Sequence, residues 1–378
     1  MKPAKVVHII TGLGTGGAEM MLYKLLSGMD RRAFSCMVIS LTNGGDLQDR
    51  IESLGVPVYS LCLKHPVTLL GKLAYFRQLV DSFHPDIVQG WMYHGNLAAW
   101  LVTSFKLKKS AKLFWNIRHS IYDIRHEKIA TRFAIRFGAM LSRRVDTIIY
   151  NAHISQKQHY ELGFNAEKSI VIPNGFDTHL FRPNPESYVA IRRELGLSEE
   201  SVLVGIIGRY HPMKDHATFL GAASIVDKVK SNVYFLLVGK GVDQDNRNLQ
   251  WLITNLGIKK NCFLLGERSD IPQITSALNV LVLSSFSEAF PNVIGEAMAC
   301  GVPVVTTDVG DASFIVKDTG VVVPPRNKEA LAKGIMDLLK QKKQEAHICG
   351  KRARNRVKKH FSLERVVKAY ESLYRGTQ

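Results

Sequence analysis

The sequence lacks the features that mark disulfide-rich, zinc-binding and membrane-spanning proteins. No apolar run approaches the roughly 20 residues that a membrane-spanning helix needs. The short apolar run after Lys5 leads into glycine-rich sequence, so we expect a first β-strand there and not a signal peptide. The five cysteines include no C-x-x-C pair: Cys36, Cys62, Cys262, Cys300 and Cys349. This odd, scattered set argues against a disulfide framework or a zinc site and favours a reducing, cytoplasmic setting.

Acidic residues are scarce, and the chain carries a formal net charge of +17. Residues 105–145 hold 11 Lys and Arg against two acids. Five of these cations recur at spacings that a helix would gather into one basic stripe: Arg125, Lys128, Arg132, Arg136 and Arg143. Large apolar residues are interleaved with them on another helix face: Ile129, Phe133, Phe137 and Met140. The stripe is either a solvated helix face or a contact with anionic lipid, and nucleic acid is a weaker alternative because no nucleic-acid motif accompanies it.

The length of 378 residues and a repeated pattern predict two α/β domains. A strand, a glycine-containing loop and a helix open the chain at "VVHIITGLGTGGAE", and the pattern restarts at "SVLVGIIGRYHPMKD". Further short apolar strands alternate with helices in each half, which indicates parallel sheets covered on both faces. We therefore expect two doubly wound, Rossmann-like domains separated by a cleft, with ligands at the carboxyl ends of the strands.

The expected domain boundaries follow from composition. We predict a first domain at residues 1–182 and a second at 196–361, joined by a linker at 181–197 that is rich in proline and polar residues. The amphipathic segment at 362–378 predicts a helix that packs back on the first domain.

The first glycine loop matches the dinucleotide fingerprint G-x-G-x-x-G at Gly12, Gly14 and Gly17. That fingerprint expects an acid at the end of the second strand, where residues 41–43 read Leu-Thr-Asn. A nicotinamide-dependent oxidoreductase therefore remains only a rival hypothesis. In either case Gly16 and Gly17 allow a backbone close to a ligand, and the following helix start favours an anion.

Two glutamates flank a predicted helix start in "SSFSEAFPNVIGEAMACGVPVV" at residues 284–305. A helix from about Asn292 to Cys300 places Glu288 in the loop before it and Glu296 just past its first turn. The positive end of this helix suits a phosphate, whereas the carboxylates suit sugar hydroxyls. The segment therefore predicts a nucleotide-sugar site.

Cations for a diphosphate lie in "GRYHPMKD", which supplies Arg209 and Lys214 after the first strand of the second half. Taken alone, Arg209 or Lys214 is more simply explained as one partner of a surface ion pair. Together with the two glutamates they favour a diphosphate site, since arginine offers a planar fork and lysine a point charge.

With these motifs, "GTGGAE" near the start and "IPNGFD" at 172–177, nearly the whole chain resembles glycosyltransferase family 4, the retaining nucleotide-sugar transferases of GT-B fold. The resemblance implies that Glu296 holds the nucleotide ribose and Glu288 lies by the transferred sugar. It assigns Arg209 and Lys214 to the diphosphate.

The resemblance implies further donor contacts. Four backbone N–H groups would contact donor sugar and phosphate: those of Ala289, Phe290, Asn292 and Val293. The loop around Arg268 would frame the base, and His119 would point at the donor sugar. Many family members read Glu-Gly-Phe-Gly at 288–291, whereas this chain has Pro291, which offers no N–H.

The activity implied by the resemblance is metal-independent transfer of a hexose with retention. UDP-glucose is the first choice of donor, with a GDP-sugar or another hexose left open. We expect no cofactor and no metal, and we interpret Asp243 and Asp245 as a solvated loop. A lipid-linked glycan is the expected acceptor, with His94 as a weak acceptor-side candidate and the inner membrane face as the location. A nucleotide-sugar epimerase of the same fold and a non-catalytic nucleotide-sugar sensor remain alternatives.

Overall fold

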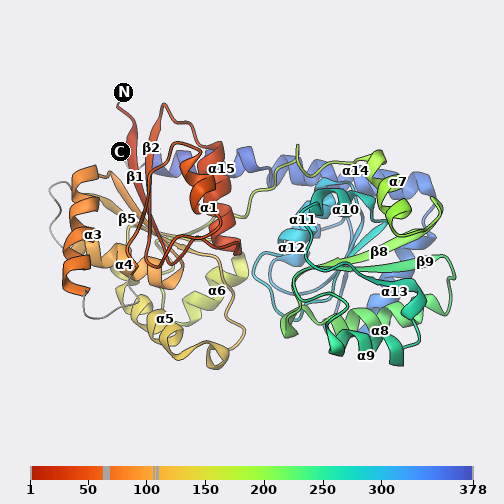
Figure 1. Cartoon of the computed structure of the whole chain (residues 1–378). Coiled ribbons are helices and arrows are strands. Elements are labelled where there is room, and N and C mark those ends of the chain that lie inside the picture. The colour runs from red at the N-terminus through yellow and green to blue at the C-terminus, as the bar shows by residue number, and fades with distance from the viewer. Residues whose placement is uncertain (1, 63–68, 105–106, 108–109, 377–378) are drawn as a thin grey trace. The chain divides into compact units, whose positions relative to one another are not determined.

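The computed structural model describes residues 2–62, 69–104, 107 and 110–376, and it divides the chain into two compact units (Figure 1). The first unit comprises residues 1–175 and 363–378, and the second comprises residues 176–362. The sequence places the first boundary at 182, seven residues later than the division at Gly175. Each unit is described by itself below.

The first unit is built on a seven-stranded parallel sheet in the order β3-β2-β1-β4-β5-β6-β7. Its strands are β1 Ala4–Ile10, β2 Phe34–Ser40, β3 Val58–Ser60, β4 Ile87–Trp91, β5 Lys112–Ile117, β6 Thr147–Tyr150 and β7 Ser169–Val171. Its helices are α1 Gly17–Gly28, α2 Gln48–Glu52, α3 Leu69–Phe83, α4 Met92–Ser104, α5 Ile129–Leu141, α6 His153–Glu161 and α15 Leu363–Arg375. Alternate residues of β1 enter different cores, Val6 one and Val7 the other, because helices cover both faces of the sheet.

The second unit repeats this plan with six parallel strands in the order β10-β9-β8-β11-β12-β13. Its strands are β8 Val202–Ile207, β9 Val233–Val238, β10 Cys262–Leu264, β11 Val280–Leu283, β12 Val304–Thr307 and β13 Val321–Val323. Its helices are α7 Pro185–Glu194, α8 His216–Asp227, α9 Arg247–Asn255, α10 Ile271–Ala277, α11 Asn292–Ala299, α12 Ala312–Val316, α13 Lys328–Lys340 and α14 Lys343–His360. The prediction of two doubly wound α/β units is confirmed.

The prediction of a linker at residues 181–197 is wrong, because residues 185–194 form helix α7 within the second unit. The side chain of Asn184 accepts hydrogen bonds from the first helical N–H groups, and Pro185 occupies the first helical position. Arg192 is fully buried, and its guanidinium donates to the carbonyls of Ser201 and Ala277. These bonds fix α7 to helix α10 and to the residue before β8, so composition alone misread it.

Helix α15 completes the first unit from the far end of the sequence, where it lies beside α1 (Figure 1). Its tyrosines reach side chains of the sheet: Tyr374 Oη donates to Gln89 Oε1 at 2.7 Å, and Tyr370 Oη accepts from Asn116 Nδ2 at 2.7 Å. Both tyrosines are fully buried in the same core as β1. The last helix is therefore part of the first unit's interior.

Candidate active site

The strand order places the candidate loops at equivalent positions in the two units. Each sheet reverses its winding direction between its two central strands, β1 and β4 in the first unit and β8 and β11 in the second. Open parallel sheets bind ligands at this switch point, beyond the carboxyl ends of the strands. The loops of residues 11–17 and 208–215, and the segments after β4 and β11, all begin at these ends.

An ion pair ties the two switch-point loops of the second unit together. Lys214 Nζ donates to Glu288 Oε1 at 2.6 Å, and Ser285 Oγ donates to the same oxygen at 2.8 Å. The side chains of Lys214 and Glu288 are only 25% and 15% exposed. Ser284 Oγ also donates to the Lys214 carbonyl at 2.8 Å. The sequence predicted both charged residues of this cluster, whereas Ser285 was missed.

The backbone after Glu288 is held by a glycine turn that follows β12. Asp311 N donates to the Ala289 carbonyl at 2.9 Å. Gly310 has φ +56°, and a Cβ there would lie 2.4 Å from the carbonyl oxygen of Glu288. Only glycine fits this approach without displacing the loop. The turn therefore fixes the backbone of Glu288 and Ala289 ahead of α11.

Helix α11 starts at Asn292, one residue after Pro291, as the sequence predicts. The preceding Phe290 is buried and stacks on Phe176 with ring centroids 6.1 Å apart. Asn292 and Val293 are half-buried in the first turn of the helix, and Glu296 is half-buried in the turn that follows. Anchoring by Phe290 thus orients the helix start, whose N–H groups carry partial positive charge.

The remaining predicted donor-side cations differ in their surroundings. Arg209 is exposed in the loop after β8. Arg268 donates to Glu194 at 2.5 Å and to Asp270 at 2.8 Å, and these two carboxylates raise the pKa of its guanidinium. Two acids therefore engage the Arg268 side chain, and the expected contact of this loop with a base stays a prediction.

Helix α8 of the second unit begins at a buried histidine. His216 is 2% exposed, and neither of its ring nitrogens has a hydrogen-bond partner among the described residues. Burial first, and then the charge of Lys214, lower the pKa of His216 to about 4. The ring is neutral at pH 7 and lies 5.5 Å from the ring of Tyr210.

The first unit holds a cavity of about 260 Å³ at its own switch point. Its lining comes from β1, α1, α4, α5 and the segments next to them: Ile10, Thr11, Glu19, Met92, Tyr93, His94, His119, Glu127 and Thr131. Both histidines singled out from the sequence, His94 and His119, therefore line one cavity. The structure adds Tyr93, Glu127 and Glu19, which sequence reasoning missed.

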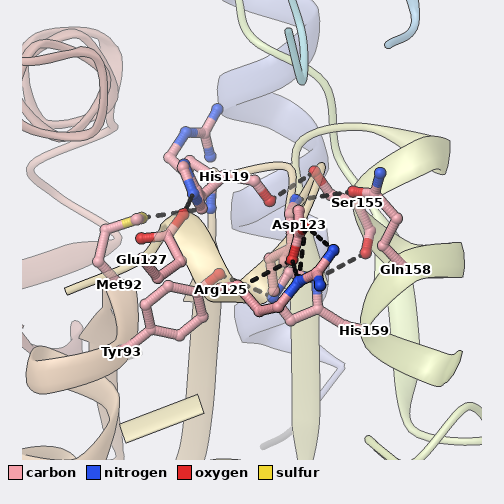
Figure 2. Close-up of polar contacts among 11 residues, drawn as sticks. Met92, Tyr93, His119, Asp123, Arg125, Glu127, Ser155, Gln158 and His159 are labelled. Atoms are coloured by element: carbon pink, nitrogen blue, oxygen red, sulfur yellow. Dashed lines mark hydrogen bonds and ion pairs between the residues drawn. The ribbon is translucent and has the colours of Figure 1, made fainter. Parts of the chain in front are cut away.

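His119 is held by a carboxylate and an aromatic ring (Figure 2). Its Nε2 lies 2.8 Å from Glu127 Oε1, and its ring meets the ring of Tyr93 edge-on at 6.2 Å. Ser155 Oγ donates to the His119 carbonyl at 2.8 Å, which ties the loop to helix α6. Glu127 is one of only two acids in residues 105–145, and this scarcity is the sequence signal that could have singled it out.

A neutral hydrogen-bond chain supports Tyr93 from behind (Figure 2). His159 Nδ1 lies 2.7 Å from the Ser155 carbonyl, so Nδ1 donates and Nε2 accepts from the Tyr93 hydroxyl at 2.9 Å. Burial lowers the pKa of His159 to about 4. Burial, and next the charge of Glu127, raise the pKa of Tyr93 well above its usual value. The chain keeps both groups uncharged at pH 7.

The glycine loop reaches this cavity through Glu19. Gly16 is the residue before α1, and a Cβ there would lie 2.3 Å from Glu19 Oε2. Burial raises the pKa of Glu19 above its usual range. At Gly17 a Cβ would meet nothing within 4 Å. Gly16 thus allows the Glu19 carboxylate to fold back against the loop, a role that the fingerprint did not predict.

The basic stripe does not lie on one helix, which corrects the sequence interpretation. Asp123 accepts a hydrogen bond from Arg125 N and forms an ion pair with the Arg125 side chain at 2.8 Å, which caps a short turn at residues 124–126. Lys128 precedes α5, and Arg143 lies in the turn after it. Only Arg132 and Arg136 belong to the helix itself. The Asx-type turn therefore delays the helix start to Ile129.

Asp243 and Asp245 lie in the loop before α9, where Asp243 Oδ1 accepts a hydrogen bond from Asp245 N at 3.1 Å. Within residues 2–62, 69–104, 107 and 110–376, no three His, Cys, Asp or Glu side chains are grouped as metal ligands. Over the same residues, every helix is too short or too polar to cross a bilayer.

Each of the two parallel-sheet units matches a family model of sugar-transferring proteins. Residues 15–180 match the family described as Glycosyltransferase Family 4, and residues 189–356 match Glycosyl transferases group 1. The chain belongs to glycosyltransferase family 4 and has the GT-B fold.

Individual relatives match only part of this chain, at about 30% sequence identity. An Escherichia coli UDP-Gal:alpha-D-GlcNAc-diphosphoundecaprenol alpha-1,3-galactosyltransferase is 28% identical over 220 residues, 57% of this chain and 56% of the relative. A Bacillus anthracis N-acetyl-alpha-D-glucosaminyl L-malate synthase is 30% identical over 243 residues, 64% of this chain and 61% of the relative. The chain thus spans less than two thirds of these relatives' length.

Similar folds are known from crystal structures. Anabaena Alr3699/HepE in complex with UDP aligns with a TM-score of 0.86 and 24% identity, covering 98% of this chain and 100% of that one. WaaG, a glycosyltransferase involved in lipopolysaccharide biosynthesis, aligns with a TM-score of 0.72 and 16% identity, again covering 98% and 100%. At these identities the likeness concerns the fold.

Proposed function

We propose that the protein is a retaining, metal-independent hexosyltransferase that uses a UDP-sugar, with UDP-glucose as the first donor to test. The observation that carries the proposal is the cluster of Lys214, Glu288 and Ser285 beside the start of α11. A lysine next to a helix N-terminus suits a leaving diphosphate, and a carboxylate suits sugar hydroxyls. The Escherichia coli relative, named for its UDP-galactose donor, supports the same donor class.

Each donor-side residue receives a role in this proposal. Arg209 and Lys214 bind the diphosphate, Glu296 binds the ribose and Glu288 contacts the transferred hexose. The backbone of the Arg268 loop binds the uracil. Four N–H groups contact the sugar and phosphate: those of Ala289, Phe290, Asn292 and Val293. Gly16 and Gly17 belong to the donor side in this proposal: Gly17 leaves open room beside the first glycine loop, whereas the space at Gly16 holds the Glu19 carboxylate.

The chemistry requires charge separation. Breaking the sugar–phosphate bond builds positive charge on the sugar ring and negative charge on the diphosphate. Fixed positive groups at Arg209, Lys214 and the start of α11 stabilise the leaving group without reorganisation. His119, oriented by Glu127, binds a hydroxyl of the transferred sugar, and His94 belongs to the acceptor side.

We propose a lipid-linked glycan as acceptor and the inner face of the cytoplasmic membrane as the location. The relative's acceptor, a diphosphoundecaprenol glycan, is of this kind. The cations of the predicted stripe would contact anionic lipid there: Arg125, Lys128, Arg132, Arg136 and Arg143. The product would enter a surface polysaccharide or a glycolipid.

A thermal-shift screen tests the donor assignment. A ligand that binds only the folded state raises the unfolding temperature with its occupancy, so UDP and one UDP-sugar should both stabilise the protein. Product analysis with that sugar and a lipid-linked acceptor then tests transfer. Stabilisation by GDP-sugars alone would refute the uracil assignment. A product epimerised in the absence of acceptor would favour an epimerase, and a shift with NAD(H) alone would favour an oxidoreductase.

A further inference from the structure

Helix α5 exposes a row of large apolar side chains. Ile129, Phe133, Phe137 and Met140 follow one another at spacings of four, four and three, which keeps them on one face of the helix. They are 65%, 69%, 44% and 71% exposed. The opposite face is buried in the first unit's core through Ala134, Ile135 and Leu141. We call these four exposed residues the apolar row.

Within residues 128–144, the apolar row is bordered by cations. Arg132 and Arg136 lie along one side of the row on α5, Lys128 precedes the helix, and Arg143 follows it. Residues 128–144 contain no Asp or Glu. An exposed apolar face of this size, edged by one sign of charge, marks an interaction surface.

We propose that α5 inserts the apolar row into the surface of an anionic lipid bilayer. Interfacial helices bury an apolar face about 5–10 Å deep and place Lys and Arg against the lipid headgroups. At 13 residues, α5 is about 20 Å long, which suits a position along the surface and not across it. The cations fit anionic headgroups, whereas a second copy of this chain would bring like charges together.

Insertion would also bring the His94–His119 cavity to the headgroups. Glu127 and Thr131 line that cavity from the segment that carries Lys128 and Ile129. The cavity therefore borders the inserted helix, and an acceptor sugar held on a lipid diphosphate would enter it from the bilayer surface. This last step rests on the proposed lipid-linked acceptor, whereas insertion itself does not.

Two sets of variants separate insertion from charge attraction. The serine pair, Phe133→Ser with Met140→Ser, removes apolar area and keeps every charge. The glutamine pair, Arg132→Gln with Arg136→Gln, removes two positive charges and keeps the apolar row. Ile348→Ser, at a 52% exposed isoleucine of the second unit, is the control for Ile129→Ser. The probe is a vesicle of phosphatidylglycerol and phosphatidylcholine, with phosphatidylcholine alone as the neutral comparison.

We expect co-sedimentation of the wild-type protein with anionic vesicles and little with neutral ones. Loss of two inserted side chains should lower the partition coefficient about tenfold or more. Ile129→Ser should weaken binding, whereas Ile348→Ser should match the wild type. In a Phe133→Trp protein, brominated lipid should quench the new tryptophan. Absence of that quenching, or equal binding by the serine pair, would overturn insertion.

The outcomes for insertion and for donor binding are distinguishable. The serine pair should keep the wild-type thermal shift with UDP, since no residue assigned to the uracil, the ribose or the diphosphate lies in α5. If only the glutamine pair loses vesicle binding, the helix contacts the bilayer through its charges alone, and the proposed insertion is wrong. If the serine pair instead turns a dimer into a monomer with unchanged vesicle binding, the row is a protein interface and the inference is wrong.

Discussion

The two units place their loops at the same point of the same topology, yet they fill it with different chemistry. In the second unit the switch-point loops carry a lysine–glutamate pair and an exposed arginine beside a helix start. In the first unit the corresponding cavity is lined by a tyrosine, two histidines and two glutamates, and a neutral hydrogen-bond chain runs from the tyrosine to the buried His159. The strand order therefore fixes where a ligand can bind, and the loop residues decide which ligand that is.

Under the proposed function, this difference corresponds to the two halves of a transfer reaction. Charged groups fixed in space suit a diphosphate that gains negative charge as its bond breaks. Tyrosine, histidine and glutamate side chains offer hydrogen-bond donors and acceptors, which suit sugar hydroxyl groups. The following variants test that division, from the largest expected effect to the smallest.

Removing the fixed cation of the second unit should have the largest effect. For Lys214→Met we expect turnover to fall about 100- to 1,000-fold, because the leaving diphosphate loses a preorganised positive charge. The measurement is release of UDP from the UDP-sugar under single-turnover conditions. Lys333→Met, at an exposed lysine of α13 in the same unit, is the matched control. Equal turnover in the two variants would contradict the assignment.

Acid should destabilise the protein through its buried neutral histidines. Burial lowers the pKa values of His8 to about 3, and of His159 and His216 to about 4. The unfolded chain takes up these protons near pH 6.5, so stability falls as pH drops from about 6.5 towards 4. Each histidine should contribute a loss of about 2 kcal/mol between pH 7 and pH 5.

Urea unfolding at pH 7 and pH 5 checks this acid effect. His216→Gln and His8→Gln should each reduce the stability lost between the two pH values. His347→Gln, at an exposed histidine of α14, should leave that loss unchanged. An identical loss in all three variants would show that the buried rings do not control acid stability.

The nucleotide contact predicted for Glu296 should be weaker than the diphosphate contact. For Glu296→Ala we expect UDP affinity to fall about tenfold, because a charge-assisted hydrogen bond to the ribose is lost. Titration calorimetry with UDP measures the change. Glu329→Ala, at an exposed glutamate of α13, controls for the loss of one negative charge. Unchanged affinity in Glu296→Ala would remove the residue from the nucleotide site.

In the first unit, neutralising Glu127 should have the smallest effect. Glu127→Gln keeps the shape of the side chain but weakens its hold on His119. We expect kcat to fall about threefold to tenfold with the KM for the UDP-sugar unchanged, since the residue acts through His119. Glu161→Gln, at an exposed glutamate of α6, is the control. A rise in KM without a change in kcat would argue against this positioning role.

Local signals predicted most of the fold and singled out the charged residues that meet in the second-unit cluster. The strands and glycine loops read directly from the sequence because short apolar runs and turn residues act over a few positions. Lys214 and Glu288 could be singled out because each lies in a short local motif that follows an apolar strand. Helix α7 was misread because its prolines and polar residues resemble a linker, whereas its burial depends on Arg192 reaching distant carbonyls.

The first-unit cavity shows what local signals leave out. Tyr93, Glu127 and His159 come from three segments that meet only in the folded sheet. The apolar row of α5 posed the same difficulty. Periodicity identifies an apolar helix face, but it does not show whether that face is buried against other parts of the protein. The neutral state of His159 likewise depends on burial, which no spacing in the sequence reveals.

The position of α15 has a consequence for the order of synthesis. The first 175 residues leave the ribosome without the two tyrosines that fill their core and bond to Gln89 and Asn116. All of residues 176–362 must emerge next, and they form a continuous unit that can close on itself. Of the two units, the one whose synthesis starts first is therefore completed second.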